Sequence, residues 1–329
     1  MKAENTKKAL VIGAAGFVGG FLAEHLKDDL NRKTFLTKLP HEKINIDGCQ
    51  VCDLDILKQD EITSLLCEVR PDEIYHLAAQ SSVAVSWKNP RLTSDVNISG
   101  CLNLLEAVRS IEDYSPRILL IGSGEEYGCL PQGVSLVSEE TPITPANPYA
   151  VTKAAQNMFG RLYAKSYGMH IVMVRAFNHI GKGQLPQFAA ADFCRQTAEI
   201  LSGKRDNIIR TGNLSAKRDF TDVRDVVRAY GLLAEKGHDG ETYNVGSGRS
   251  ISIENLLCKI IDLSGIEIKR ELDPEKLRPS DIPEIRADIT KLQRDTGWKP
   301  EIPISRTLSE MLGYELEKIR EEQTNDRKR

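Results

Sequence analysis

The sequence has no long hydrophobic run, no targeting segment and no marked charge excess of either sign. No stretch of the 329 residues approaches the roughly 18 to 20 consecutive apolar side chains that span a bilayer. The polar N-terminus lacks the pattern of a secretory signal, and 44 lysines and arginines against 47 acids leave no basic stripe for a nucleic acid. We therefore expect neither a membrane nor a nucleic acid as a partner.

Cysteines are few and scattered. The seven lie apart except for Cys49 and Cys52, whose CxxC has no second pair or nearby histidine. Neither a zinc site nor a disulfide framework is supported, so we expect no metal, reduced thiols and a cytoplasmic protein. The hydrophobic fraction of 40% is nevertheless sufficient for a sizeable folded core.

Short apolar runs alternate with longer amphipathic stretches over about the first 175 residues. The predicted strands are Ala9–Ile12, Thr34–Leu36, Gln50–Asp53, Glu73–Leu77, Arg117–Ile121 and His170–Arg175, and the predicted helices cover about 17–30, 56–69, 92–110 and 149–167. This rhythm predicts an α/β protein with a Rossmann-type, doubly wound parallel sheet.

The rhythm breaks after Arg175. We expect a loop over 178–187, a helix over 188–202, a strand-like piece and a helix within 218–235, and a strand at Glu241–Val245. A smaller, interleaved C-terminal lobe should take about 181–217 and 248–315, and the sheet domain 1–180 plus about 218–247. The charged tail, 316–329, is predicted to fray.

A glycine-rich segment, residues 13–19 (GAAGFVG), connects the first strand to the first helix. Glycines allow the tight turn and a close approach to a pyrophosphate, and the helix N-terminus offers N–H groups and a positive dipole end. The segment predicts a dinucleotide site, whose contacts are Gly13, Gly16, Phe17, Val18 and Gly19.

The second strand ends at Lys38, with no acid before Glu42. A carboxylate at this place binds a ribose 2′-OH, whereas a cation accommodates a 2′-phosphate. Lys38 therefore favours NADP(H), although NAD(H) remains an alternative if Lys38 is only a surface charge.

Tyr149 and Lys153 form a YxxxK motif on a predicted helix that begins at Pro148. The i, i+4 spacing places them on one face, where the ammonium is expected to favour the phenolate. Ser123 lies 26 residues before Tyr149, just past the strand Arg117–Ile121, and can hydrogen-bond the same substrate oxygen. Ser123, Tyr149 and Lys153 are the predicted catalytic set, with Tyr149 exchanging the proton.

The glycine spacing and the Ser–Tyr–Lys set resemble the extended branch of the short-chain dehydrogenase/reductase superfamily, which acts on nucleotide sugars. Glu125 matches a glutamate of sugar 4,6-dehydratases and related 4-ketosugar reductases, which implies a catalytic role. The resemblance implies further cofactor contacts at Asp53, Leu54, Leu77, Ala78, Ala79, Asn97, Tyr149 and Lys153, with Lys153 contacting the nicotinamide ribose. It implies substrate contacts at Ser81, Ser82, Glu125 and Asn178.

Later segments resemble enzymes of GDP-mannose derivatives. These are 175–179 (RAFNH), 212–220 (GNLSAKRDF), 277–280 (LRPS) and 297–300 (GWKP). The resemblance implies a GDP-linked sugar as substrate, and Arg218 and Arg278 would suit its diphosphate. It also implies a homodimer with a four-helix contact made by 92–110 and 149–167.

Two branches fit this pattern, the GDP-mannose 4,6-dehydratases and the reductases that use their product. The dehydratases carry a long basic insertion between the second and third strands, but here Asp53 follows Lys38 by only 15 positions. We therefore favour NAD(P)H-dependent reduction of the C4 keto group of a GDP-4-keto-6-deoxyhexose to a GDP-deoxyhexose such as GDP-D-rhamnose. A dehydratase, and less so a nucleotide-sugar 4-epimerase, is the alternative.

Overall fold

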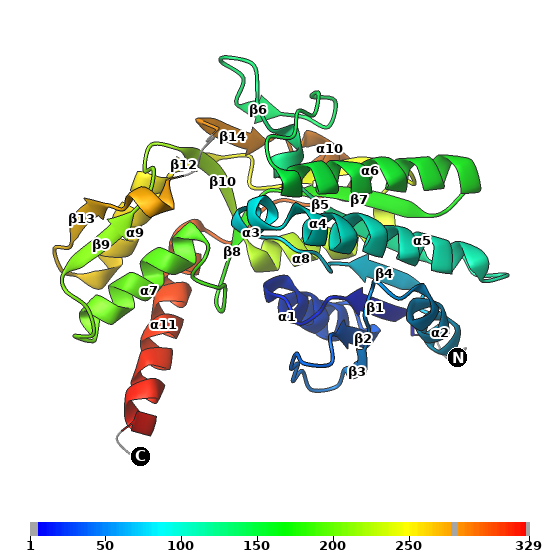
Figure 1. Ribbon diagram of the computed structural model, residues 1–329, viewed down its shortest axis with the longest axis horizontal. Helices are drawn as coiled ribbons and strands as arrows, with labels where there is room; N and C mark the ends of the chain where they lie inside the picture. The colour runs from blue at the N-terminus through cyan, green and yellow to red at the C-terminus, as the bar shows by residue number, and fades with distance from the viewer. Residues whose placement is uncertain (1–5, 278–281, 327–329) are drawn as a thin grey trace.

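The computed structural model describes residues 6–277 and 282–326. A seven-stranded parallel sheet has the order β11-β7-β5-β4-β1-β2-β3 (Figure 1). Its strands are β1 (Lys8–Ile12), β2 (Lys33–Lys38), β3 (Gln50–Asp53), β4 (Glu73–His76), β5 (Arg117–Ser123), β7 (Ile171–Ala176) and β11 (Thr242–Val245). The predicted doubly wound sheet is confirmed. Strands after β1 are added first on its β2 side and then, from β4 onward, on its other side, and sheets of this kind bind ligands at the carboxyl edge next to this switch point.

Helices cover both faces of the sheet. One face carries α1 (Phe17–Glu24) and α8 (Val223–Lys236), and the other α2 (Gln59–Val69), α5 (Gly100–Ser110) and α6 (Pro148–Tyr167) (Figure 1). Alternate residues of each strand supply the two cores, since Val11 packs toward α1 and α8 while Leu10 and Ile12 pack toward the other helices. Burial on both faces explains why these strands read as continuous apolar runs.

Two predicted helices contain a π-helical turn. The turn η1 (His25–Asp29) extends α1, and η2 (Asp95–Ser99) lies between α4 (Pro90–Ser94) and α5. A separate short helix, α3 (Val83–Lys88), precedes α4. Such turns often occur at functional sites, and η2 contains Asn97, one of the predicted site residues.

The second lobe has its own sheet and core (Figure 1). Its strands are β6 (Leu136–Val137), β8 (Asn178–Ile180), β10 (Lys217–Asp222), β12 (Ser250–Ser252) and β14 (Glu284–Ala287), with the separate pair β9 (Ile208–Thr211) and β13 (Lys269–Leu272). Its helices are α7 (Ala189–Leu201), α9 (Ile253–Ser264) and α11 (Ile304–Asp326), while α10 (Thr290–Thr296) packs against the main domain.

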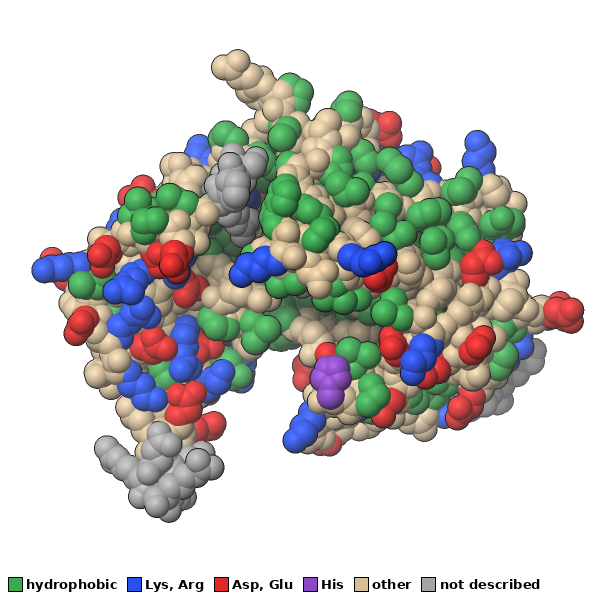
Figure 2. Space-filling view, viewed as in Figure 1, with side chains coloured by type: hydrophobic (Ala, Val, Ile, Leu, Met, Phe, Trp, Pro, Cys, Tyr) green, Lys and Arg blue, Asp and Glu red, His purple; other side chains and the backbone are tan. Residues whose placement is uncertain are grey.

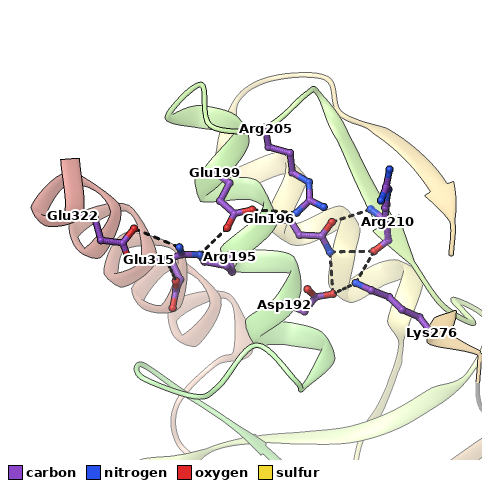
Figure 3. A network of polar contacts seen from close by, with 9 residues as sticks. All are labelled: Asp192, Arg195, Gln196, Glu199, Arg205, Arg210, Lys276, Glu315 and Glu322. Carbon is purple, nitrogen blue, oxygen red and sulfur yellow. Dashed lines mark hydrogen bonds and ion pairs between the residues drawn. The ribbon is translucent and has the colours of Figure 1, made fainter. Parts of the chain in front are cut away.

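Two predictions are corrected here. The predicted loop 178–187 begins with β8, which pairs with β10 and is too short to show a strand periodicity. The tail does not fray at Glu317, because α11 continues to Asp326 with Ile319 buried against the lobe. Arg195 on α7 holds this helix through Glu315 and Glu322 (Figure 3).

No helix within the described residues is long and apolar enough to cross a membrane. All seven cysteines are free thiols, including Cys49 and Cys52.

Candidate active site

The glycine-rich loop fits tightly between β1, β2 and the loop after β4. Gly13 has φ +83°, and a Cβ there would lie 2.6 Å from the Ala78 backbone. The Gly13 N–H donates to Thr37 Oγ1 at 3.2 Å. At Gly19, a Cβ would lie 2.1 Å from the Ala14 carbonyl oxygen. The protein's own packing therefore requires glycine at both positions.

Gly16 differs from these two glycines. It is exposed at the N-cap of α1, and a Cβ there would meet only the Gly13 carbonyl oxygen, at 3.6 Å. The open side of the loop thus lies where α1 presents its first N–H groups. Next to it, the ring of Phe17 stacks on His179 at 6.2 Å and 5°, and Val18 is partly buried against the core. This cradle fits an anionic pyrophosphate.

The ends of β2 and β3 bring Lys38 and Asp53 together as an ion pair. Leu54 is buried, and its N–H donates to the Lys38 carbonyl oxygen at 2.9 Å. Asp53 remains more than half exposed, so the pair is accessible from outside. Both residues lie on the carboxyl edge of the sheet, on the side of β1 away from β4.

The loop after β4 is fixed by backbone and side-chain contacts. Leu77 and Ala78 both donate to the Ile12 carbonyl oxygen at 2.9 Å. Asn97 is fully buried; its side chain accepts from Gln80 N at 2.8 Å and donates to Thr152 Oγ1 on α6 at 2.9 Å. Asn97 thereby connects this loop to α6, the helix that carries Tyr149.

The predicted contacts at the end of that loop differ in exposure. Ala79 is partly buried and Ser81 is exposed. Ser82 caps α3, with its hydroxyl accepting from Val85 N at 3.3 Å.

Ser123 ends β5 and begins the 3₁₀ turn η3 (Gly124–Tyr127) through a capping box. Its hydroxyl accepts from Glu125 N at 3.2 Å, and its own N–H donates to Glu126 Oε1 at 2.9 Å. The hydroxyl oxygen accepts this bond, and its hydrogen remains available for another acceptor. The Ser123 hydroxyl also acts on the Tyr149 phenol, whose pKa it lowers.

The electrostatics of Tyr149 contradict one prediction. Burial raises the pKa of the Tyr149 phenol well above its usual range, the Ser123 hydroxyl opposes this rise, and the charges of Glu125 and Glu126 add to it. The expectation that Lys153 makes this phenol acidic is therefore wrong for this structure. The phenol is held in its protonated form, which is the form that donates a proton.

Lys153 is directed to the end of β5 instead. Its ammonium donates to the Ile121 carbonyl oxygen at 2.7 Å and to Gln156 Oε1 at 3.1 Å. Burial lowers the pKa of Lys153 to about 8, and the Glu126 carboxylate opposes this lowering. The two acceptors stabilise the ammonium in its buried position.

A pocket beside Ser123 contains several predicted substrate contacts. It is lined by Ser123, Gly124, Glu125, Ala176, Phe177, Asn178, Arg218, Ile282 and Ile285. Glu125 is oriented by Asn147, whose amide donates to it at 3.1 Å and whose oxygen caps α6. Arg218 donates to the Ile282 carbonyl oxygen at 2.6 Å. The structure thus brings residues of β5, β8 and β10 together in one pocket. The other predicted diphosphate contact, Arg278, lies outside the described residues.

A second pocket lies in the smaller lobe. Its walls are Thr211, Gly212, Asn213, Leu214, Arg270, Glu271, Leu272 and Leu277. A Cβ on Gly212 would lie 2.6 Å from the Lys276 carbonyl oxygen, so glycine is needed for this approach. Gln196 stabilises the adjoining wall, because its side chain hydrogen-bonds to the Asp192 carboxylate and to the backbone N–H and carbonyl oxygen of Arg210 (Figure 3). Lys276 forms an ion pair with Asp192.

Sequence reasoning missed several residues of the site. Hydrogen bonds that no sequence motif indicates bring in Asn147, Gln156 and Thr37. The Glu126–Arg175 pair was also missed, although the S-x-x-E spacing of Ser123 and Glu126 is a readable capping-box signal.

Comparisons with known proteins agree with this arrangement. A family model described as GDP-mannose 4,6 dehydratase matches residues 10–311. A GDP-6-deoxy-D-mannose reductase of Pseudomonas aeruginosa is 33% identical over 317 residues, covering 96% of this chain and 100% of the relative. A GDP-mannose 4,6-dehydratase of Vibrio cholerae is 29% identical over 361 residues, covering 95% of this chain and 94% of the relative.

Solved structures similar to this one also include nucleotide-sugar enzymes. RMD from Pseudomonas aeruginosa complexed with NADPH has a TM-score of 0.82 and 32% identity, covering 94% of this chain and all of that one. A Thermus thermophilus UDP-glucose 4-epimerase complexed with NAD has a TM-score of 0.83 and 28% identity, covering 94% of this chain and 98% of that one. The predicted resemblance to nucleotide-sugar reductases, dehydratases and epimerases is therefore confirmed.

Proposed function

The chain belongs to the GDP-mannose 4,6 dehydratase family, and we propose that it reduces the C4 keto group of a GDP-4-keto-6-deoxyhexose with NADPH in preference to NADH. The observation that carries this proposal is the pair Ser123 and Tyr149 at the carboxyl edge of the sheet. Both are hydroxyl donors, and the phenol is kept protonated beside a pocket that contains Glu125, Asn178 and Arg218.

Alignment length favours the reductase over the dehydratase. The alignments to the two relatives cover almost equal shares of this chain, 96% and 95%, but are 317 and 361 residues long. The dehydratase therefore contains segments for which this chain has no counterpart. This agrees with the short connection between Lys38 and Asp53.

The cofactor site fits a dinucleotide phosphate. Gly16 leaves open space at the N-terminus of α1, and Lys38 supplies a cation at the end of β2 for a 2′-phosphate. Asp53, Leu54 and the loop from Leu77 to Ala79 lie along the same carboxyl edge of the sheet. A reduced nicotinamide held along this edge supplies a hydride.

The chain's own groups handle the proton and the substrate. Tyr149 donates its phenolic proton to the carbonyl oxygen as that oxygen gains charge, and Ser123 donates a hydrogen bond to the same atom. Lys153 is held by Ile121 and Gln156 at the same end of β5. Glu125, Asn178 and the serines after β4 border the sugar.

The GDP portion of the substrate is assigned to the smaller lobe. Arg218 lies in the pocket beside Ser123 and suits a diphosphate, since a guanidinium matches paired phosphate oxygens. The second pocket, with Asn213 and Arg270 among apolar walls, suits the nucleoside.

A homodimer through α4, α5 and α6 is part of the proposal. Val151, Met158 and Leu162 on α6 are each more than half exposed and share one stripe. Hydrophobic side chains gather over this side of the molecule (Figure 2). A second copy that presents the same stripe would bury them in a four-helix contact.

Absorbance at 340 nm distinguishes the alternatives. With GDP-mannose alone, the protein should consume no NADPH; after a dehydratase has acted on the GDP-mannose, consumption should begin. Loss of water from GDP-mannose without net use of cofactor would assign the protein to the dehydratases instead.

The variant Tyr149→Phe tests the proton donor. Loss of a general acid costs typically about 10²–10⁴-fold in turnover, while NADPH binding should be nearly unchanged. Tyr167→Phe is the control, since Tyr167 lies at the exposed end of the same helix. Full turnover in Tyr149→Phe would refute the assignment.

A further inference from the structure

The end of β2 adjoins the glycine-rich loop. Thr37 accepts two hydrogen bonds from that loop, one to its Oγ1 from Gly13 N at 3.2 Å and one to its carbonyl oxygen from Ala14 N at 2.8 Å. Lys38, the next residue, therefore lies beside the loop to which the pyrophosphate is assigned. In sheets of this kind, the residue at this place meets the 2′ position of the adenosine ribose.

The Lys38 ammonium is engaged by the protein itself. It forms an ion pair with Asp53 Oδ1 and donates to the Leu39 carbonyl oxygen at 3.3 Å. The ion pair follows from the sheet, because Lys38 and Asp53 are register partners at the ends of the parallel strands β2 and β3. The Lys38 side chain is 17% exposed and that of Asp53 is 57% exposed. Lys38 is thus held by an acid that a ligand can reach.

The fold also returns an acid to the end of β2. Glu42 Oε2 accepts from Leu39 N at 2.8 Å, so this N–H is already used and is not available to a phosphate. Residues 38–53 contain two lysines against three acids, and the connection from β2 to β3 therefore carries no excess of positive charge. A 2′-phosphate would have to share Lys38 with a carboxylate of its own sign.

We propose that Asp53 is a positioning residue for the choice of cofactor, which restrains the Lys38 ammonium and so limits the preference for NADPH over NADH. The inference rests on the proposed function only for the location of the dinucleotide. A 2′-phosphate attracts Lys38 and is repelled by Asp53, whereas a 2′-hydroxyl carries no charge. The carboxylate therefore opposes the binding of one cofactor and not of the other.

The exposure of Asp53 decides how strong this opposition is. Ion pairs that solvent reaches contribute little free energy, because water screens them and competes for both partners. A 2′-phosphate can therefore draw Lys38 away from Asp53, and the preference for NADPH is reduced rather than abolished. For the same reason, the protein should fold normally without the ion pair.

The variant Asp53→Asn removes the charge and keeps a side-chain oxygen. Fluorescence titration without substrate gives the Kd of each reduced cofactor, and the preference is the Kd for NADH divided by that for NADPH. This ratio should rise about three- to tenfold, because Lys38 is then free for the 2′-phosphate. Both cofactors carry the same adenine, so any adenine contact of residue 53 cancels. An unchanged or lower ratio would overturn the proposal.

Asp47→Asn is the matched control, since Asp47 is an exposed acid on the same connection between β2 and β3. It makes the same change in net charge and should leave the ratio in place; an equal rise would assign the effect to net charge and refute the role of Asp53. In a Lys38→Ala background, Asp53→Asn should change the ratio by less than half as much. A rise as large as in the wild type would show that Asp53 does not act through Lys38.

A second readout needs neither the nicotinamide nor the sugar. Calorimetry compares adenosine 2′,5′-bisphosphate with 5′-AMP, and only the first should bind more tightly to Asp53→Asn than to the wild type. Equal changes for the two nucleotides would contradict the inference. Because these ligands report on the site whatever reaction the protein catalyses, keto-sugar reduction can fail its own test while this result stands.

Discussion

Replacing Gly16 by alanine should impair cofactor binding while leaving the fold intact. A Cβ at this position approaches other protein atoms no closer than 3.6 Å, and φ −71° with ψ 167° is open to alanine. The free energy of unfolding should change by about 1 kcal/mol or less, the usual difference between these residues at a helix N-cap. The methyl group would instead occupy the space where the loop meets a pyrophosphate. Losing one hydrogen bond to a charged group costs about 1.5–3 kcal/mol.

The expected result is a rise of roughly ten- to a hundredfold in the Kd for NADPH, measured by its fluorescence on titration. Gly20→Ala is the matched control, since Gly20 lies on the same helix and a Cβ there meets nothing within 4 Å. That variant should gain about 0.5–1 kcal/mol of stability and keep its affinity. Wild-type affinity in Gly16→Ala, or equal losses in both variants, would refute the assigned pyrophosphate site.

Three further changes test other parts of the account. Lys38→Ala should raise the KM for NADPH about tenfold and leave that for NADH unchanged, because only NADPH carries the 2′-phosphate; equal effects in steady-state kinetics would contradict this. Burial lowers the pKa of His76 to about 3, so the folded protein binds fewer protons than the unfolded chain and loses stability as pH falls below 6.5. Between pH 7 and pH 5 this loss is about 2 kcal/mol, and His76→Leu should lack it in urea unfolding; the same slope in both proteins would be contrary evidence. Met158→Glu with Leu162→Glu should give a monomer by analytical ultracentrifugation, and an intact dimer would exclude α6 from the contact.

The sheet and the tight turn of the glycine-rich loop could be predicted from the sequence because their signals are local. A buried strand such as β5 needs an apolar run, and Gly13 is required by a turn within a few residues of it. The direction of Lys153 could not be predicted this way, since its acceptor at Ile121 lies 32 residues earlier in the chain. The helical spacing placed Tyr149 and Lys153 on one face but did not show which group each would contact.

The C-terminal tail also shows that a local sequence signal does not reveal contacts between distant parts of the chain. Charge density over 317–329 predicted fraying, yet Ile319 is buried in the core that α7 and α9 form with α11. That face exists only in the folded lobe. The capping glutamate Glu126, in contrast, carried a local signal that a search for S-x-x-E spacing would have found.

The most direct test of the central claim uses NADPH deuterated at the transferred position of its nicotinamide. The protein is given the product of a GDP-mannose 4,6-dehydratase, and the GDP-deoxyhexose formed is examined by mass spectrometry and NMR. The account predicts one deuterium, bound to carbon at C4, with one cofactor oxidised per sugar. Deuterium at another carbon, or a product that contains none, would contradict it.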